Sequence, residues 1–227
     1  MSTHAHALDE HAHANHDPNL QHHFHTMQQQ FDASKLGMWL FLATEILLFG
    51  VLFVGFGLSQ ARWPEEFKQA HHHLDRVLGA FNTVVLLVSS FTMVMAVHSA
   101  ANSKRKATIN YLVVTILCAV AFLVVKYFEY SHKIHEGLLP GQYFTYLANT
   151  DPMAKGNSVF FGFYFMMTGL HGFHILGGVV VLCILLAQTI KGRYSASYYT
   201  PVDLVGLYWH IVDLIWIYLF PLLYLIG

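Results

Sequence analysis

Residues 36–58 read LGMWLFLATEILLFGVLFVGFGL, and this stretch decides the fold. It contains a single charged side chain, Glu45, and lacks the alternation of polar and apolar residues that marks a strand. A helix of roughly 20 apolar residues crosses a hydrocarbon core about 30 Å thick. Because lipid offers no hydrogen-bonding partners to the backbone, the stretch predicts a transmembrane helix.

Four further apolar runs of similar character follow it, at 77–98, 108–130, 158–190 and 203–226. They predict an all-α, polytopic membrane protein in which residues 34–227 form a bundle of five transmembrane helices. The run at 158–190 is longer than a bilayer requires, so we expect that helix to tilt or to project beyond the membrane. Charged residues are only 11% of the chain and the net charge is −1, so no broad surface for nucleic acid is predicted.

The first 33 residues are polar and contain eight histidines, at positions 4, 6, 11, 13, 16, 22, 23 and 25. A segment with so few apolar residues is expected to be disordered. Its histidines, and the HHH run at 71–73, could bind metal ions loosely. We favour a solvated tail, because a flexible chain offers no preformed coordination geometry. Cys118 and Cys183 lie far apart in apolar runs, which indicates neither a disulfide framework nor a thiolate metal site.

The distribution of basic residues predicts the orientation. Five spans place the termini on opposite sides of the membrane. The side that holds the N-terminal tail carries six Lys and Arg residues, most of them in short connections, and the other side carries five. Short loops weigh most in this rule, so we expect a cytoplasmic N terminus and a periplasmic C terminus in a bacterial inner membrane.

Two carboxyl groups lie within the predicted spans, where a charge costs at least a few kcal/mol. Glu45 is about ten residues into its helix, or ~15 Å deep. It is either a carboxyl that exchanges protons or a neutral one that is hydrogen-bonded to a neighbouring helix, and both interpretations fit. Glu129 follows Lys126 by three residues, so an i,i+3 ion pair near the end of that helix is predicted.

The remaining ionisable groups are histidines and an aspartate. His171 and His174 are spaced three apart, as are His210 and Asp213, and His98 ends the second span. Glycines at 169, 172, 177 and 178 would let a neighbouring backbone approach. We therefore expect the fourth and fifth helices to pack here, with hydrogen bonds between His and Asp across the contact.

These histidines could instead ligate haem, as in a membrane cytochrome. Bis-histidine haem requires opposed residues on two helices at matching depth. Only His210 is available opposite the adjacent pair His171 and His174, so we favour polar packing. Asn82, Thr83, Ser89, Ser90 and Thr92 form a polar stripe on the second helix, which we interpret as interhelical hydrogen bonding.

Five segments in the same order resemble those of one family, subunit III of the haem–copper oxidases, in its short five-helix form. They are LGMWLFLATEILLF (36–49), FNTVVLLVSSFTMVMAVHSA (81–100), YFEYSH (127–132), FGFYFMMTGLHGFHILGG (161–178) and LYWHIVDLIWIYLF (207–220). The resemblance covers residues 35–226. It implies a subunit that is not itself catalytic, binds no haem or copper, packs against subunit I beside subunit II, and supports proton uptake and sustained turnover.

The resemblance also implies roles for individual residues. Glu45 matches the family's buried, reactive carboxyl. Glu129, His171, His174, His210 and Asp213 match positions that serve packing and internal hydrogen bonds. Phospholipid is a further candidate ligand, although the two leading helices that wall the lipid cleft of longer members are missing here. An accessory protein of a nitric oxide reductase and a histidine-ligated cytochrome are the alternatives, and the electron donor, cytochrome c or quinol, is not predicted.

Overall fold

The computed structural model describes residues 20–147 and 151–225, and in these ranges the chain is helical throughout its regular structure. Five helices are long and apolar enough to cross a membrane, as predicted. They are α2 (Met27–Arg62), α4 (Arg76–Ala101), α5 (Arg105–His135), α6 (Ala154–Ile190) and α7 (Thr200–Phe220).

The first helix begins earlier than predicted. Residues 27–33 were assigned to the disordered tail, but they form the first turns of α2. The Thr26 hydroxyl accepts a hydrogen bond from the Gln29 amide at 3.1 Å, which caps the helix, and the Gln28 side chain donates to Asp32 at 3.0 Å. A polar helix end of this kind carries no apolar periodicity and is missed by a search for apolar runs. Residues 20–26 of the predicted tail form turns and bends before the helix, and residues 1–19 lie outside the described residues.

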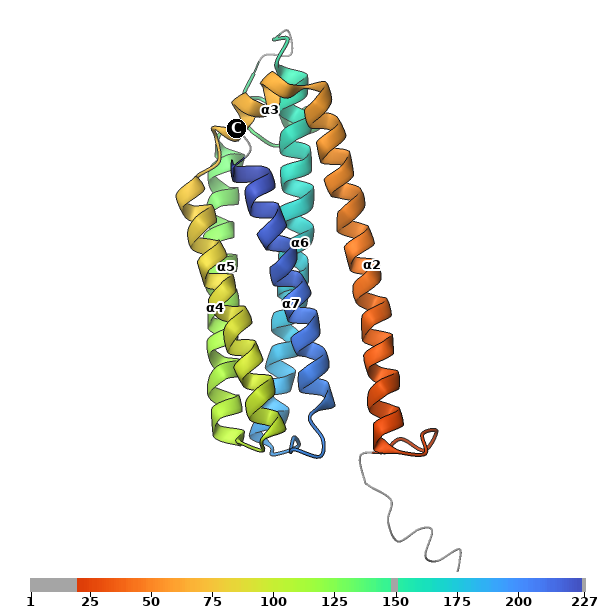
Figure 1. Ribbon diagram of the computed structural model, residues 1–227. Coiled ribbons are helices and arrows are strands. Elements are labelled where there is room, and N and C mark those ends of the chain that lie inside the picture. The colour runs from red at the N-terminus through yellow and green to blue at the C-terminus, as the bar shows by residue number, and fades with distance from the viewer. Residues whose placement is uncertain (1–19, 148–150, 226–227) are drawn as a thin grey trace, which may run out of the picture.

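Three short elements of the described chain lie at the end of the bundle away from the start of α2, and one of them is a 3₁₀ turn over Gly141–Tyr143 between α5 and α6 (Figure 1). Helix α3 (Pro64–His71) occupies a segment predicted to be a connection, and it begins with a proline at its first position, where the missing N–H is harmless. It buries Phe67, Ala70 and His71. The α-helical pattern of α7 ends at Phe220, and the described chain continues as a π-helical turn over Pro221–Leu225.

Helices α4, α5, α6 and α7 form the body of the bundle, and α2 lies along one side of it (Figure 1). Helix α4 packs on α5 and α7, α6 packs on α5 and α7, and α2 contacts α6 and α7. Aromatic residues fill the interior, with Trp209, Trp216 and Tyr164 completely buried. Only Leu42, Phe49 and Phe56 of α2 are buried, so α2 is the most peripheral helix.

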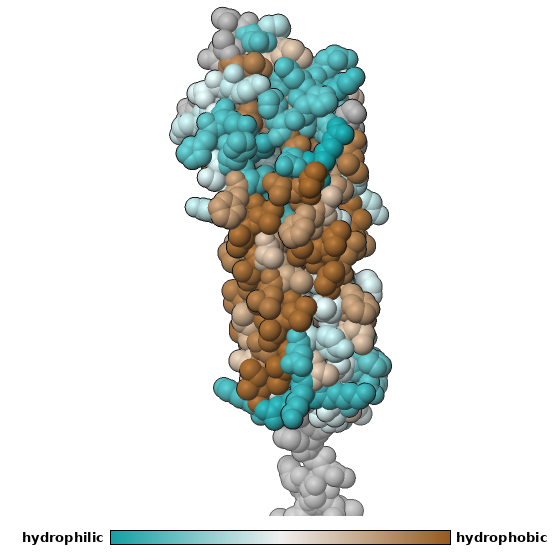
Figure 2. All heavy atoms as spheres, turned by 90° about the vertical axis from the view of Figure 1, so that its left-hand side faces the viewer, coloured by the Kyte–Doolittle hydropathy of each residue, from teal (hydrophilic) through white to brown (hydrophobic). Residues whose placement is uncertain are grey.

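The outer surface is apolar over the middle of the bundle and polar at both ends. Figure 2 shows this band on the side formed by α4 and α5. Large apolar side chains such as Val51, Phe91 and Leu117 are 62–72% exposed. Such a surface is stable only where lipid or another apolar protein covers it. The chain is therefore a multi-pass membrane protein, with the start of α2 and the end of α7 at opposite ends of the bundle.

Candidate functional site

Glu45 and His174 form a polar contact between α2 and α6 in the middle of the bundle. The Glu45 Oε2 and His174 Nε2 atoms lie 2.8 Å apart, and both side chains are nearly buried, at 13% and 14% exposure. The distance is that of an ion pair. The angles at Glu45 Oε2, however, are not those of a regular hydrogen bond. The aromatic ring of Phe49 packs on the imidazole. The sequence predicted a buried Glu45 but did not predict its partner.

The second nitrogen of His174 contacts its own helix. His174 Nδ1 lies 2.8 Å from the carbonyl oxygen of Leu170, which can only accept, so Nδ1 is the donor of this contact. Nε2 is therefore the ring nitrogen that faces Glu45.

A second polar cluster surrounds Glu129. Lys126 Nζ lies 2.9 Å from Glu129 Oε2, which confirms the predicted i,i+3 pair. The hydroxyls of Tyr164 and Tyr224 donate to Glu129 Oε1 at 2.8 and 2.5 Å, and Lys126 donates to Tyr224 at 2.6 Å. The ammonium also lies 4.7 Å from the ring centre of Trp216. The cluster joins α5, α6, α7 and the C-terminal turn. It therefore holds four elements together in the interior and does more than pair two residues at a helix end.

The predicted hydrogen bonds between His and Asp across the contact of α6 and α7 are not present. His171 is completely buried, and its ring packs against Phe122 and Trp216 at centre distances of 5.5 and 5.3 Å. Neither of its nitrogens has a hydrogen-bond partner among the described residues. His171 and His174 are three residues apart and therefore point about 60° apart around the helix, which directs them to different neighbours.

His210 and Asp213 on α7 face α4 rather than α6. His210 Nδ1 lies 2.7 Å from the Ser90 hydroxyl. Asp213 is 2% exposed, and Ser90 is close enough to interact with it. Neither of its carboxyl oxygens has a hydrogen bond of regular geometry within the described chain. Asn82 of α4 is likewise buried without a partner there. His98 is exposed at the end of α4 and contacts Asn102, so it lies apart from the other predicted residues.

The polar stripe of α4 does hold helices together, as predicted. Trp209 and Trp216 of α7 donate their indole N–H groups to Ser89 at 2.7 Å and Thr83 at 3.1 Å. Thr92 bonds the hydroxyl of Thr115 on α5 at 2.8 Å. These bonds link α4 to both of its neighbours.

The four glycines of α6 serve different purposes. A Cβ at Gly178 would lie 2.5 Å from the Trp209 ring, so Gly178 admits the close approach that we predicted. At Gly169 the added Cβ would be in ordinary contact with Tyr130, and at Gly172 and Gly177 it would meet nothing within 4 Å. The prediction of close backbone packing was therefore wrong for Gly172 and Gly177.

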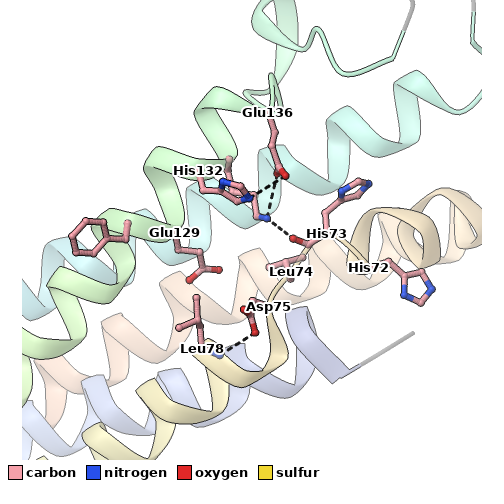
Figure 3. A pocket seen from close by; sticks show the side chains of 10 residues that line it. His72, His73, Leu74, Asp75, Leu78, Glu129, His132 and Glu136 are labelled. Carbon is pink, nitrogen blue, oxygen red and sulfur yellow. Dashed lines mark hydrogen bonds and ion pairs between the residues drawn. The ribbon is translucent and has the colours of Figure 1, made fainter.

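A pocket of about 490 Å³ opens at the end of the bundle near α3, and Figure 3 shows its labelled residues. Glu129 forms part of its wall, beside Asp75 and the segment His72–Leu74. Lys133 donates to the His73 carbonyl oxygen, and His132 lies 3.1 Å from Glu136. The pocket connects the Glu129 cluster with the polar end of the molecule.

His71 lies beneath this pocket, outside the spans, and is 1% exposed. Its Nδ1 donates to the carbonyl oxygen of Leu223 at 3.2 Å, and its Nε2 accepts from Arg76 at 2.7 Å. Burial lowers the pKa of His71, and the Leu223 carbonyl partly opposes this effect. The neutral ring ties α3 to the C-terminal turn, a structural role that the HHH run did not suggest.

Potential metal ligands are not clustered in residues 20–147 and 151–225, where no three His, Cys, Asp or Glu side chains are grouped to hold an ion. His171, His174 and His210 each face a different neighbour, so the arrangement gives no support to the haem-ligating alternative. The tail histidines up to His16 lie outside the described residues.

Comparison with known proteins gives a consistent result along the whole chain. The model of the family described as cytochrome c oxidase subunit III matches residues 15–145 and 137–227. The probable quinol oxidase subunit 3 of Staphylococcus saprophyticus is 28% identical over 214 residues, which are 92% of this chain and 98% of that protein. The quinol oxidase subunit 3 proteins of Bacillus spizizenii and Bacillus subtilis are each 29% identical over 209 residues, 88% of this chain and 92% of theirs.

Proposed function

Because the chain belongs to the cytochrome c oxidase subunit III family, we propose that it serves a respiratory haem–copper oxidase as its non-redox third subunit. In this role it binds no haem or copper and has no oxidase activity alone. The oxidase that contains it reduces O₂ to water. The observation that carries the proposal is the family match, which extends from residue 15 to the C terminus.

The relatives support an assembly with other oxidase subunits. Their names describe third subunits of quinol oxidases, and this chain aligns with nearly their full length. The chain's own surface is consistent with this, since its large exposed apolar area suits a partner within the membrane. We propose that subunit I is the direct partner, with subunit II in the same complex, and that the N terminus is cytoplasmic and the C terminus periplasmic.

Two features support a contribution to proton uptake and sustained turnover. The Glu45 carboxyl faces His174 Nε2 at 2.8 Å inside the bundle, and we propose that this pair holds one exchangeable proton. A groove of about 320 Å³ between α2 and α7, lined by apolar residues that include Ile46, Phe49 and Ile211, suits a phospholipid acyl chain. Exchange at Glu45 and a lipid in this groove are both part of the proposal.

Purification of the tagged chain from its own membranes, followed by haem and metal analysis, tests the proposal. We expect co-purification of subunits that contain two haems and copper, and O₂ consumption by the complex but not by the separated chain. Activity with reduced cytochrome c and with a quinol then assigns the donor. Recovery with a haem and non-haem iron partner would instead identify a nitric oxide reductase, and a haem spectrum of the chain alone would identify a cytochrome.

A further inference from the structure

The outward surface formed by α4 and α7 differs from the rest of the membrane-facing surface, because it has a polar floor. Two adjoining cavities of about 190 and 300 Å³ lie along it and share His210 in their walls. The first also contains Ser90 and Asp213, and the second contains His98 and Asp203 near the membrane boundary. We call this surface the α4/α7 groove.

His210 is the residue that points to a partner. Among the described residues its one polar contact is to Ser90 through Nδ1, so its Nε2 has none, and it lies in the walls of both cavities. Asp213 beside it is 98% buried, its carboxyl oxygens are shielded from the surface, and Ser90 is close enough to interact with it. Lipid tails offer no hydrogen-bond partner to an imidazole, and polar groups at this depth normally face protein.

The rim of the cavity is formed by exposed apolar side chains of the kind that pack between transmembrane helices. Leu87, Leu214 and Ile217 surround the polar floor and are 49%, 46% and 42% exposed. Interfaces between transmembrane helices combine close apolar packing with hydrogen bonds across the contact. Leu47 of α2 and Phe173 of α6 are 69% and 70% exposed elsewhere on the outer surface, and neither lines one of these two cavities.

We propose that the α4/α7 groove receives a transmembrane helix of another oxidase subunit, whose side chain fills the smaller cavity and forms a hydrogen bond with His210 Nε2. This inference rests on the proposed function and adds the location of the interface. The cavity has the size of one large side chain, as a knob-in-hole contact requires. Lipid tails would supply no hydrogen-bond partner for His210, and cross-linking distinguishes a second copy of this chain from another oxidase subunit.

Site-specific photo-cross-linking in membranes that contain the whole oxidase tests the location. A benzophenone amino acid replaces Leu87 or Leu214 at the rim, and Leu47 or Phe173 as matched exposed controls. We expect the rim positions to form adducts with another oxidase subunit at least fivefold more often than the controls. Equal yields from the controls, adducts with lipid alone, or adducts with a second copy of this chain would each overturn the proposal.

A bulky substitution at the rim gives a second measurement that does not depend on the buried residues. Leu87 lines this groove but not the groove between α2 and α7, so Leu87→Trp should reduce the other oxidase subunits recovered with the chain at least fivefold, while Leu47→Trp should not. Unchanged recovery with Leu87→Trp would contradict the proposal. If no oxidase subunit is recovered with the unmodified chain, the proposed function itself fails, which distinguishes the two results.

Discussion

The buried pair Lys126–Glu129 makes a quantitative prediction about a double-mutant cycle. In Glu129→Gln, Lys126 keeps its charge in a dry interior but loses the opposite charge, and its remaining partners are neutral: the new amide oxygen, the Tyr224 hydroxyl and nearby aromatic rings. Removing one partner of a buried ion pair costs about 3–5 kcal/mol. In Lys126→Met, Glu129 still accepts from two tyrosines, so we expect the loss of one charged hydrogen bond, about 1.5–3 kcal/mol.

The double variant removes both charges, so its destabilisation should fall well below the sum of the single effects, with a coupling of roughly 2–3 kcal/mol. The free energy of unfolding is measured in mixed micelles at increasing dodecyl sulfate fraction, with tryptophan fluorescence as the signal. Trp216 lies beside Lys126 and is completely buried, so it reports on this region.

The exposed pair Lys35–Asp203 is the matched control. Its atoms are 3.1 Å apart, but the side chains are 37% and 19% exposed. Lys35→Met should therefore cost only about 0–1 kcal/mol. Additive effects at Lys126 and Glu129, to within about 0.5 kcal/mol, would refute the reasoning that the pair is an energetically coupled unit.

Three further predictions follow from single contacts. Gly178→Ala forces a Cβ to 2.5 Å from Trp209 and should cost about 1–3 kcal/mol, whereas Gly177→Ala should be neutral or stabilising by up to about 1 kcal/mol in a detergent heat-stability assay. The pKa of His71 is lower in the folded chain than the ordinary histidine value of 6.5, so below that pH the unfolded chain binds a proton that the folded chain does not. The free energy of unfolding should therefore fall as the pH drops below 6.5, and it should fall less steeply in His71→Gln. Glu45→Gln should leave recovery of haem per subunit unchanged, because an amide N–H can donate to His174 Nε2; collapse of assembly would show a structural role.

The five spans could be predicted from the sequence because lipid imposes a simple requirement on length and polarity. Helix ends were less predictable, since they depend on polar caps and on neighbours. The Thr26 side chain caps helix α2, which therefore includes Met27–Ala33. Helix α3 is stabilised by burial of Phe67 and Ala70. Neither feature has a signal in apolar content.

For the candidate sites as well, contacts within one helix could be predicted and contacts between helices could not. The Lys126–Glu129 pair was predicted because it lies within one helix, where spacing determines proximity. Tyr224 is 98 residues from Lys126, and its place in the cluster depends on how the helices pack. The prediction for His171 and His174 failed for a related reason, because a three-residue offset leaves an angle of about 60°, which is enough to direct two side chains to different helices.

His174 lies where the peripheral helix joins the bundle. Its ring contacts Glu45 of α2, and its backbone carbonyl accepts a hydrogen bond from Tyr208 of α7 at 2.8 Å. Within the described residues, no other polar contact links α2 to α6 or α7 at mid-membrane depth, and the Lys35–Asp203 pair acts only at the end. This contact therefore adds a polar link to the apolar packing of Leu42, Phe49 and Phe56, which also orients α2. If Glu45 exchanges protons as proposed, we expect the change to act first on the position of α2 and through it on the groove between α2 and α7.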